Sequence, residues 1–314
     1  AKLAANAKTG DTTVTVANAA ALGLKAGDLI LVIQMQGATI DSTANTVQYG
    51  SITNLNNAGL YEIAAVAAVN TTTNVITLDG CGGLKNNYSA AGHAQVVRVP
   101  QYTTLSVPAG TSITGDAWDG DKGGIVALYV SGKTTLAGSI TATALGFRGG
   151  ATDNTTSGPV AAFVNFASAT AGDSAEHGEG VAGSSVEYDA LTGRFGRGAP
   201  ANGGGGGNAH NGGGGGGANG LNARAWTGQG VMLAPNNNFA KAWALDPGYI
   251  ANANALTNSS GGGRGGYTYG STDQDATTVA PATAAWGGDT RREVGGLGGR
   301  AIDASPATRV FFGG

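Results

Sequence analysis

The pattern of apolar and polar positions over the first 100 residues is typical of short β-strands. Valines alternate with threonines in "DTTVTVA", which has the two-residue period of a strand with one apolar face. A continuous apolar run of strand length, residues 29–33, is typical of a strand buried on both faces. Two further apolar runs flank a polar turn at residues 70–74 and predict a hairpin, although the first, "GLYEIAAVAAV", also has helix propensity. We therefore predict a small β-sandwich or barrel over residues 1–100.

Shorter apolar runs, broken by single glycines, continue through residues 101–150. Helix signals are weak here and throughout the chain. Short strands with regularly placed glycines suit the stacked rungs of a β-helix. We expect β-helix-like rungs in this second domain, with strands at residues 104–107, 125–130, 134–136 and 139–143.

Glycine replaces the strand pattern in the third predicted domain, residues 151–314. This glycine-rich domain holds 37 of the 57 glycines, with the longest runs in "ANGGGGGNAHNGGGGGGANG", residues 201–220. Flexible glycine linkers usually lack aromatic residues, yet three of the four tryptophans lie in this domain. Collagen is excluded, because it needs glycine at every third position with frequent proline. The glycine runs therefore favour an ordered structure of another kind.

An extended helix with three residues per turn is a structure that glycine can pack on all sides. Such polyglycine II helices have no internal hydrogen bonds, so neighbouring helices must supply them laterally. We predict packed polyglycine II helices with buried glycines; loops over a β-helix end and a disordered linker are the alternatives. The predicted lattice positions are Gly203, Gly204, Gly205, Gly206, Gly207, Gly212, Gly213, Gly214, Gly215, Gly216 and Gly217.

Charge and cysteine content limit the classes of partner. Charged residues make up 12% of the chain and the net charge is -3, which argues against nucleic acid, a partner that needs a basic face. No apolar run reaches the roughly 18 residues of a membrane span. The single cysteine, Cys81, excludes an intramolecular disulfide and is expected to be a buried thiol that assembly does not need. The first residues, "AKLAAN", fit a mature secreted chain or an excised piece.

The sequence has no pattern typical of a catalytic or cofactor-binding site. Its three histidines are far apart, and no zinc or nucleophile motif is present. Asp116, Asp119 and Asp121 are weak calcium candidates, but an Asp-Gly turn between strands is the preferred explanation. The side chains of "EHGE", residues 176–179, offer metal ligands, and a solvated loop is preferred there too. We predict no catalytic residue, no cofactor and no metal.

Apolar residues near both ends of the chain suggest how copies assemble. Val14 and Val16 lie in a strand that could present an open sheet edge, while Val310, Phe311 and Phe312 form an apolar strand near the last residue. Each phenylalanine left in water costs about 1.5–3 kcal/mol, so this strand must dock, either on its own subunit or on the next. Docking on the next subunit gives a head-to-tail contact that does not close. We expect a homo-oligomeric filament of this kind.

Eight segments of the chain carry a family resemblance. Five lie before residue 151: "GDLILVIQMQGATI", "YGSITNLNNAGLYEIAAV", "AQVVRVPQYTTLSV", "DAWDGDKGGIVALYVSG" and "TATALGFRGG". Three follow: "GEGVAG", "GRGAPANGGGGGNAHNGGGGGG" and "GGLGGRAID" continued by "TRVFFGG". Together they resemble the N-terminal module and the glycine-rich part of gliding-motility-associated adhesin-like proteins of Bacteroidetes and their myxobacterial relatives. At the level of architecture the chain also resembles phage tail-fibre adhesins whose tips are polyglycine sandwiches.

The resemblance covers most of the chain, fits less well at residues 221–260, and implies cell-surface display, adhesion or appendage building without an enzymatic role. We therefore expect a mostly-β, secreted structural protein that builds a bacterial surface filament or an adhesive appendage. One alternative is an adhesin module that binds a receptor or a surface glycan. A second is a carbohydrate-active β-helix enzyme, which needs paired carboxylates in a groove; the second half of the chain offers few clustered candidates.

Overall fold

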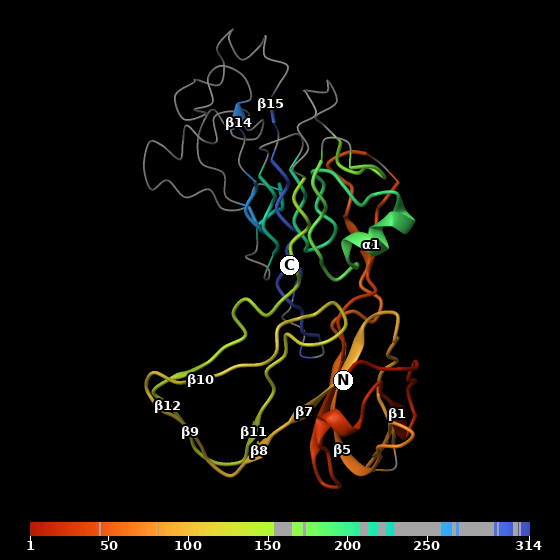
Figure 1. The fold of residues 1–314 in the computed structure, drawn as a ribbon, viewed down its shortest axis with the longest axis vertical. Helices are drawn as coiled ribbons and strands as arrows, with labels where there is room; N and C mark the ends of the chain where they lie inside the picture. Colours follow the sequence, from red (N-terminus) through yellow and green to blue (C-terminus); the bar gives the residue numbers. More distant parts are fainter. Residues whose placement is uncertain are drawn as a thin grey trace. The chain divides into compact units, whose positions relative to one another are not determined.

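A computed structural model divides the chain into two compact units, which we describe one at a time (Figure 1). Unit 1 comprises Ala1–Gly37, Asn56–Phe147 and Ser305–Phe312, and unit 2 comprises Ala38–Leu55, Arg148–Ala304 and Gly313–Gly314. Unit 1 thus includes residues 305–312 from the end of the chain, and unit 2 includes residues 38–55 from its first part. Neither assignment was predicted. The structure describes residues 1–43, 45–80, 82–153, 165–171, 174–207, 213–218, 224–228, 259–265, 268–269, 292–293, 295–303, 307 and 309–314. Cys81 and Gly212 lie outside the described residues.

Unit 1 is built on a five-stranded antiparallel sheet with the strand order β1-β6-β5-β2-β7. In chain order these strands are β1 (Thr13–Thr15), β2 (Leu29–Gln34), β5 (Tyr61–Asn70), β6 (Val75–Leu78) and β7 (Ala94–Val99). The strands predicted at the positions of β1, β2, β5 and β6 are confirmed, and the run with helix propensity is β5. Asn74, in the turn between β5 and β6, has a φ of 56°, a conformation that asparagine tolerates better than most residues.

Strand β2 is buried on both faces, as the continuous apolar run predicted. Ile30 and Val32 are fully buried and belong to the cluster that includes Val14, Val66, Ile76 and Val96. Leu31 and Ile33 point to the other face, into a second cluster with Met35, Val99, Trp118 and Phe312. The two clusters give unit 1 a core on each side of its central strand.

The N-terminal residues join the two edge strands of this sheet. Lys2 forms an antiparallel bridge with Gln95 of β7, and Leu3 forms one with Val16, next to β1. Val14 and Val16 are each only 1% exposed. The open edge expected around these valines is therefore wrong, because residues 2–4 pair with that side of the strand and the valine side chains fill the core.

Two successive coils of the chain, each with three short strands, follow the sheet, and we call them the first turn and the second turn. The first turn consists of β8 (Gln101–Tyr102), β9 (Leu105–Val107) and β10 (Ser112–Ile113), and the second of β11 (Tyr129–Val130), β12 (Thr134–Leu136) and β13 (Ser139–Ile140). Each strand of the second turn pairs in parallel with its counterpart in the first, and Figure 1 shows the two turns following the same path. The strands are shorter than predicted at residues 125–130 and 139–143.

The remaining elements are small. A 3-10 helix, Ala20–Leu22, lies in unit 1; unit 2 contains β3 (Thr39–Ile40), β4 (Ile52–Asn54), α1 (Ser185–Tyr188), a 3-10 helix (Asp189–Leu191), β14 (Thr268–Tyr269) and β15 (Arg292–Glu293). A capping box between Ser184 and Glu187 starts α1, a signal that the sequence analysis missed. Within the described residues, no helix is long and apolar enough to cross a membrane.

Candidate functional site

Unit 2 contains four glycine-rich segments, residues 203–207, 213–218, 259–265 and 295–300, which Figure 1 shows as extended chain. Backbone hydrogen bonds join these segments laterally. None of them forms a helix or strand among the described residues. The bonds that join them run from Gly205 N to Leu297 O (2.8 Å), Gly215 N to Gly205 O (2.8 Å), Gly216 N to Gly263 O (2.8 Å), Gly262 N to Gly299 O (2.9 Å) and Gly265 N to Gly296 O (2.9 Å). We call this set of segments the glycine bundle.

The donors of residues 296–300 repeat their direction every third residue. Gly296 and Gly299 both donate to the segment 213–218, at 2.9 Å to Gly213 O and Gly216 O. Leu297 and Arg300 both donate to the stretch 197–201, while Gly298, between them, donates to Gly228 O at 2.8 Å. A backbone with three residues per turn presents its N–H groups to three neighbours in this rotation. The segment 295–300 is therefore bonded on several sides.

Close approach, and not backbone conformation, explains the glycines at the centre of the bundle. Gly262, Gly296 and Gly298 all lack the left-handed φ that favours glycine. A Cβ atom on Gly296 would overlap Gly205 O, and one on Gly298 would overlap Gly262 O. Since the obstructing atoms belong to the backbone, no side-chain movement could relieve the overlap.

The bundle also has an exposed layer, contrary to the prediction that all of its glycines are buried. Residues 203–207 are buried, but Gly214, Gly216 and Gly263 are exposed. A Cβ on Gly263 would meet no atom within 4 Å, and one on Gly214 would meet only Gly205 O, at 3.7 Å. Residues 208–211, which separate the two longest glycine runs in the sequence, lie outside the described residues.

Aromatic and arginine side chains flank the bundle within unit 2. The guanidinium of Arg300 lies 3.6 Å from the centre of the Trp226 ring and donates to the carbonyls of Val47 and Tyr49 at 2.9 and 3.1 Å. Trp226 Nε1 donates to Gly298 O at 3.0 Å. Burial lowers the pKa of Arg300 to about 10. These contacts satisfy the carbonyl of Gly298 in the bundle and the carbonyls of Val47 and Tyr49 beside it.

Residues 176–179 form neither a metal site nor the solvated loop that was preferred. Glu179 is 3% exposed and accepts a bond from Arg148 Nε at 2.9 Å, while Glu176 accepts one from Arg194 Nε at 2.8 Å. His177 is fully buried, donates to a backbone carbonyl through Nε2, and has a pKa that burial lowers to about 4. The two carboxylates and the Nε2 atom of His177 are thus bonded to the protein itself, whereas the buried Nδ1 of His177 has no hydrogen-bond partner within the described part of the chain.

The aspartate cluster lies in a turn of unit 1. Asp121 pairs with Lys2 at 2.9 Å, whereas Asp119 pairs with Lys122 and accepts the backbone N–H groups of residues 121 and 122. Burial alone would raise the pKa of Asp119, but these bonds bring it down to about 2. Asp116 is exposed. Among the described residues, no group of three potential ligands is arranged to hold a metal ion.

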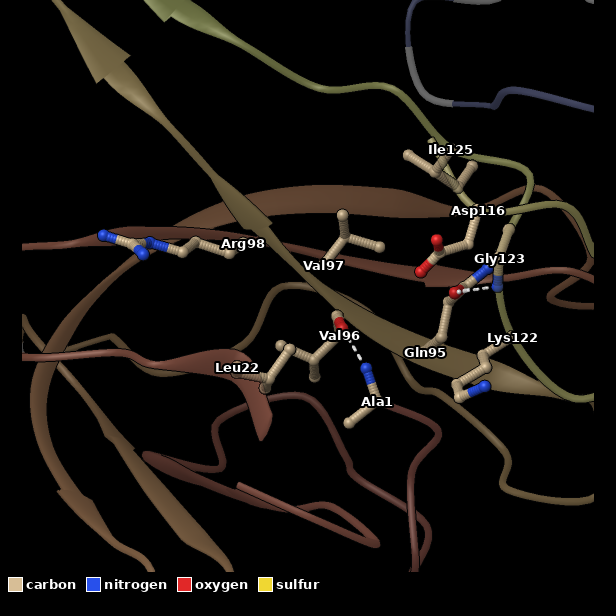
Figure 2. A pocket seen from close by; sticks show the side chains of 10 residues that line it. All are labelled: Ala1, Leu22, Gln95, Val96, Val97, Arg98, Asp116, Lys122, Gly123 and Ile125. Carbon is tan, nitrogen blue, oxygen red and sulfur yellow. Dashed lines mark hydrogen bonds between the residues drawn. The ribbon is translucent and has the colours of Figure 1, made fainter. Parts of the chain in front are cut away.

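A small pocket in unit 1 lies between β7 and residues 116–125 (Figure 2). Gln95, on its floor, donates through Nε2 to Gly123 O and accepts from Gly123 N, both at 2.9 Å. The pocket holds about 160 Å³, well below the roughly 300–1,000 Å³ of sites for drug-sized ligands. Its size suits a few water molecules and gives no support to a small-molecule site.

The apolar segment near the last residue docks in its own unit. Phe312 is 8% exposed and meets the rings of Trp118 and Phe147 edge-on, with centroids 5.7 and 5.2 Å away. Phe311 lies against Gly59, and Val310 N donates to Gly59 O at 2.9 Å. The expected docking of Val310, Phe311 and Phe312 on the next subunit therefore needs revision, because the segment already fills a site in unit 1.

Comparison with known proteins identifies no family. No family model and no curated protein matches the chain. Among solved structures, the tailspike protein gp49 from Pseudomonas phage LKA1 matches with 16% identity and a TM-score of 0.21, over 43% of this chain and 21% of the tailspike chain. The chain thus spans about a fifth of that tailspike's length, and a likeness this weak carries no argument about fold or function.

Proposed function

We propose that this chain is a non-enzymatic structural protein that builds a bacterial surface filament or an adhesive appendage, and that its glycine bundle is a lattice of polyglycine II helices. The observation that carries the proposal is the rotation of hydrogen-bond donors along residues 296–300. A lattice of this kind is held together by backbone groups in several directions. Such an architecture presents little side-chain chemistry, which suits a structural role.

The side chains that the bundle does contain support the same function. Arg300 and Trp226 satisfy bundle and loop carbonyls, and Leu297 is buried among glycines with 3% exposure. The low net charge of -3 over 314 residues leaves little electrostatic repulsion between stacked copies. The family resemblance of the chain, with its secreted and surface-displayed members, supports an extracellular location.

Electron microscopy of the purified full chain tests this proposal. We expect unbranched fibres that appear above a critical protein concentration, because subunits that join head to tail add without limit. A monodisperse monomer at every concentration and salt condition tested would refute the filament function. Binding of the monomer to a glycan array, with no fibres, would support the adhesin alternative instead.

A further inference from the structure

The two turns of parallel strands in unit 1 have open edges. Each of the pairs β8–β11, β9–β12 and β10–β13 is a sheet of only two strands. Among the residues that the structure describes, no third strand adds to the outer edge of β11, β12 or β13, or to the outer edge of β8, β9 or β10. Unpaired strand edges are templates for further pairing.

The second turn also leaves apolar side chains uncovered. Val107 of β9 is 3% exposed, but Leu136, its partner in register on β12, is 52% exposed. Ile113 of β10 is half-buried, while its partner Ile140 on β13 is 39% exposed. The same positions are thus better covered in the first turn than in the second.

The chain itself indicates what fits this surface, because the first turn already lies against the second. Ser112 and Ser139 are in register with their hydroxyl oxygens 2.7 Å apart, and Ile113 is in register with Ile140. A second copy of the chain, placed one turn further on, would bring its own Ser112 and Ile113 to Ser139 and Ile140. The ladders of like residues would continue without interruption.

Charge permits this stacking. Lys133 is the single charged residue within residues 101–113 and 129–140. It lies next to β12, and in a stack the uncharged first turn of the next copy would separate it from the Lys133 of that copy, so like charges would not meet. The two strand edges therefore meet without an electrostatic penalty.

We propose that the second turn, β11–β13, is the docking edge for the first turn, β8–β10, of a second copy of this chain. This inference rests on the proposed filament function and names the contact that would join its subunits. The two surfaces are different, so the contact is head-to-tail, and copies that stack one turn after another along a common direction form an open chain and not a ring. Every copy would accept a neighbour at one edge and present the other edge to the next.

Two lysine variants and a matched control test the contact. Leu136→Lys and Ile140→Lys each place a charge in the proposed interface at an exposed position, so the monomer is expected to fold. We expect the assembled fraction, measured by sedimentation, to fall about tenfold or more, since a desolvated lysine without a partner is costly. Val186→Lys, at a side chain of unit 2 that is 63% exposed, is the control and should assemble normally. Equal assembly by all three variants would overturn the inference.

Cross-linking gives an independent measurement. In a Cys81→Ser background, Ser112→Cys and Ser139→Cys are made as separate proteins with different tags, mixed and oxidised. We expect a covalent product that carries both tags, formed between copies. A dominant Ser139→Cys homodimer, or no cross-link while fibres form, would overturn the contact and leave the filament function standing. Cross-linked pairs without fibres would support the contact and count against the filament.

Discussion

Adjacent glycines of the bundle, Gly262 and Gly263, are expected to respond oppositely to the addition of one methyl group. Neither has a left-handed φ, so alanine is compatible with both backbone conformations. Gly262 is buried, and a Cβ there would overlap the carbonyl oxygens of Gly216 and Gly217. Gly263 is exposed and its Cβ would meet nothing within 4 Å.

The expected magnitudes follow from these surroundings. At Gly263, alanine should stabilise the protein by about 0.4–1 kcal/mol, because it restricts the unfolded chain. At Gly262 the same gain is opposed by overpacking, about 1–3 kcal/mol, and by disturbance of the bond from Gly262 N to Gly299 O (2.9 Å), about 0.5–1.5 kcal/mol. The net change at Gly262 is a destabilisation of roughly 1–3 kcal/mol.

Urea unfolding of Gly262→Ala and Gly263→Ala beside the parent protein measures the difference. Since the chain has two units, circular dichroism and calorimetry should both be recorded to identify the transition of unit 2. We expect the two variants to shift the midpoint in opposite directions. If Gly262→Ala unfolds like the parent, the glycine segments are not closely packed and the bundle described here is wrong.

Three further predictions concern other parts of the chain. Phe312→Ala should destabilise unit 1 by about 3–5 kcal/mol in urea unfolding, because it removes one ring from an aromatic cluster and leaves a cavity. Unchanged stability with loss of fibres would instead favour strand exchange between subunits. His177 has a folded-state pKa of about 4, below the ordinary value of 6.5. Between these two pH values the unfolded chain therefore binds more protons than the folded chain. Titration of His177 does not affect the stability of the protein above pH 6.5, and it lowers that stability increasingly as the pH falls towards 4. The variant His177→Phe should lose that part of the pH dependence in a melting series from pH 7 to pH 4, and an unaltered profile would contradict the assignment. Removal of divalent cations with EDTA should leave the melting temperature unchanged, because the carboxylates of Asp119 and Asp121 are already paired with lysines; a clear drop would restore the calcium hypothesis.

Local patterns were sufficient to predict strands β1, β2, β5 and β6 of the five-stranded sheet of unit 1, but not the short strands β8 and β10 that follow it. The continuous apolar run of β2 predicted burial on both faces, and both faces are buried. The alternation at Val14 and Val16 correctly placed an apolar face, but periodicity does not reveal what pairs with a strand edge. That edge is occupied by residues 2–4, which carry no strand pattern of their own.

Glycine runs contain less information about position. In a strand or helix, the side chains distinguish inner from outer faces, but every position of a glycine run looks the same. Gly215 and Gly216 are neighbours in one run, and a Cβ would overlap Leu297 O at Gly215 yet have space at Gly216. Which glycines are buried therefore depends on segments distant in sequence, and the expectation of uniform burial was wrong for that reason.

The polar residues around the bundle were missed for a related reason. Glu176, His177 and Glu179 look like surface residues in a glycine-rich loop, but Arg148 and Arg194, which pair with the two glutamates, lie elsewhere in the chain. Burial of such groups becomes favourable only when those partners are in place. No local signal in the sequence contains that information.

Electron cryomicroscopy of the assembled protein is the sharpest test of how the copies join. We predict fibres of identical copies in which β11–β13 of one copy lies against β8–β10 of the next, with the glycine segments packed side by side inside each subunit. Fibres whose subunits meet elsewhere would contradict the proposed contact. Discrete monomers under all conditions would contradict the filament function itself.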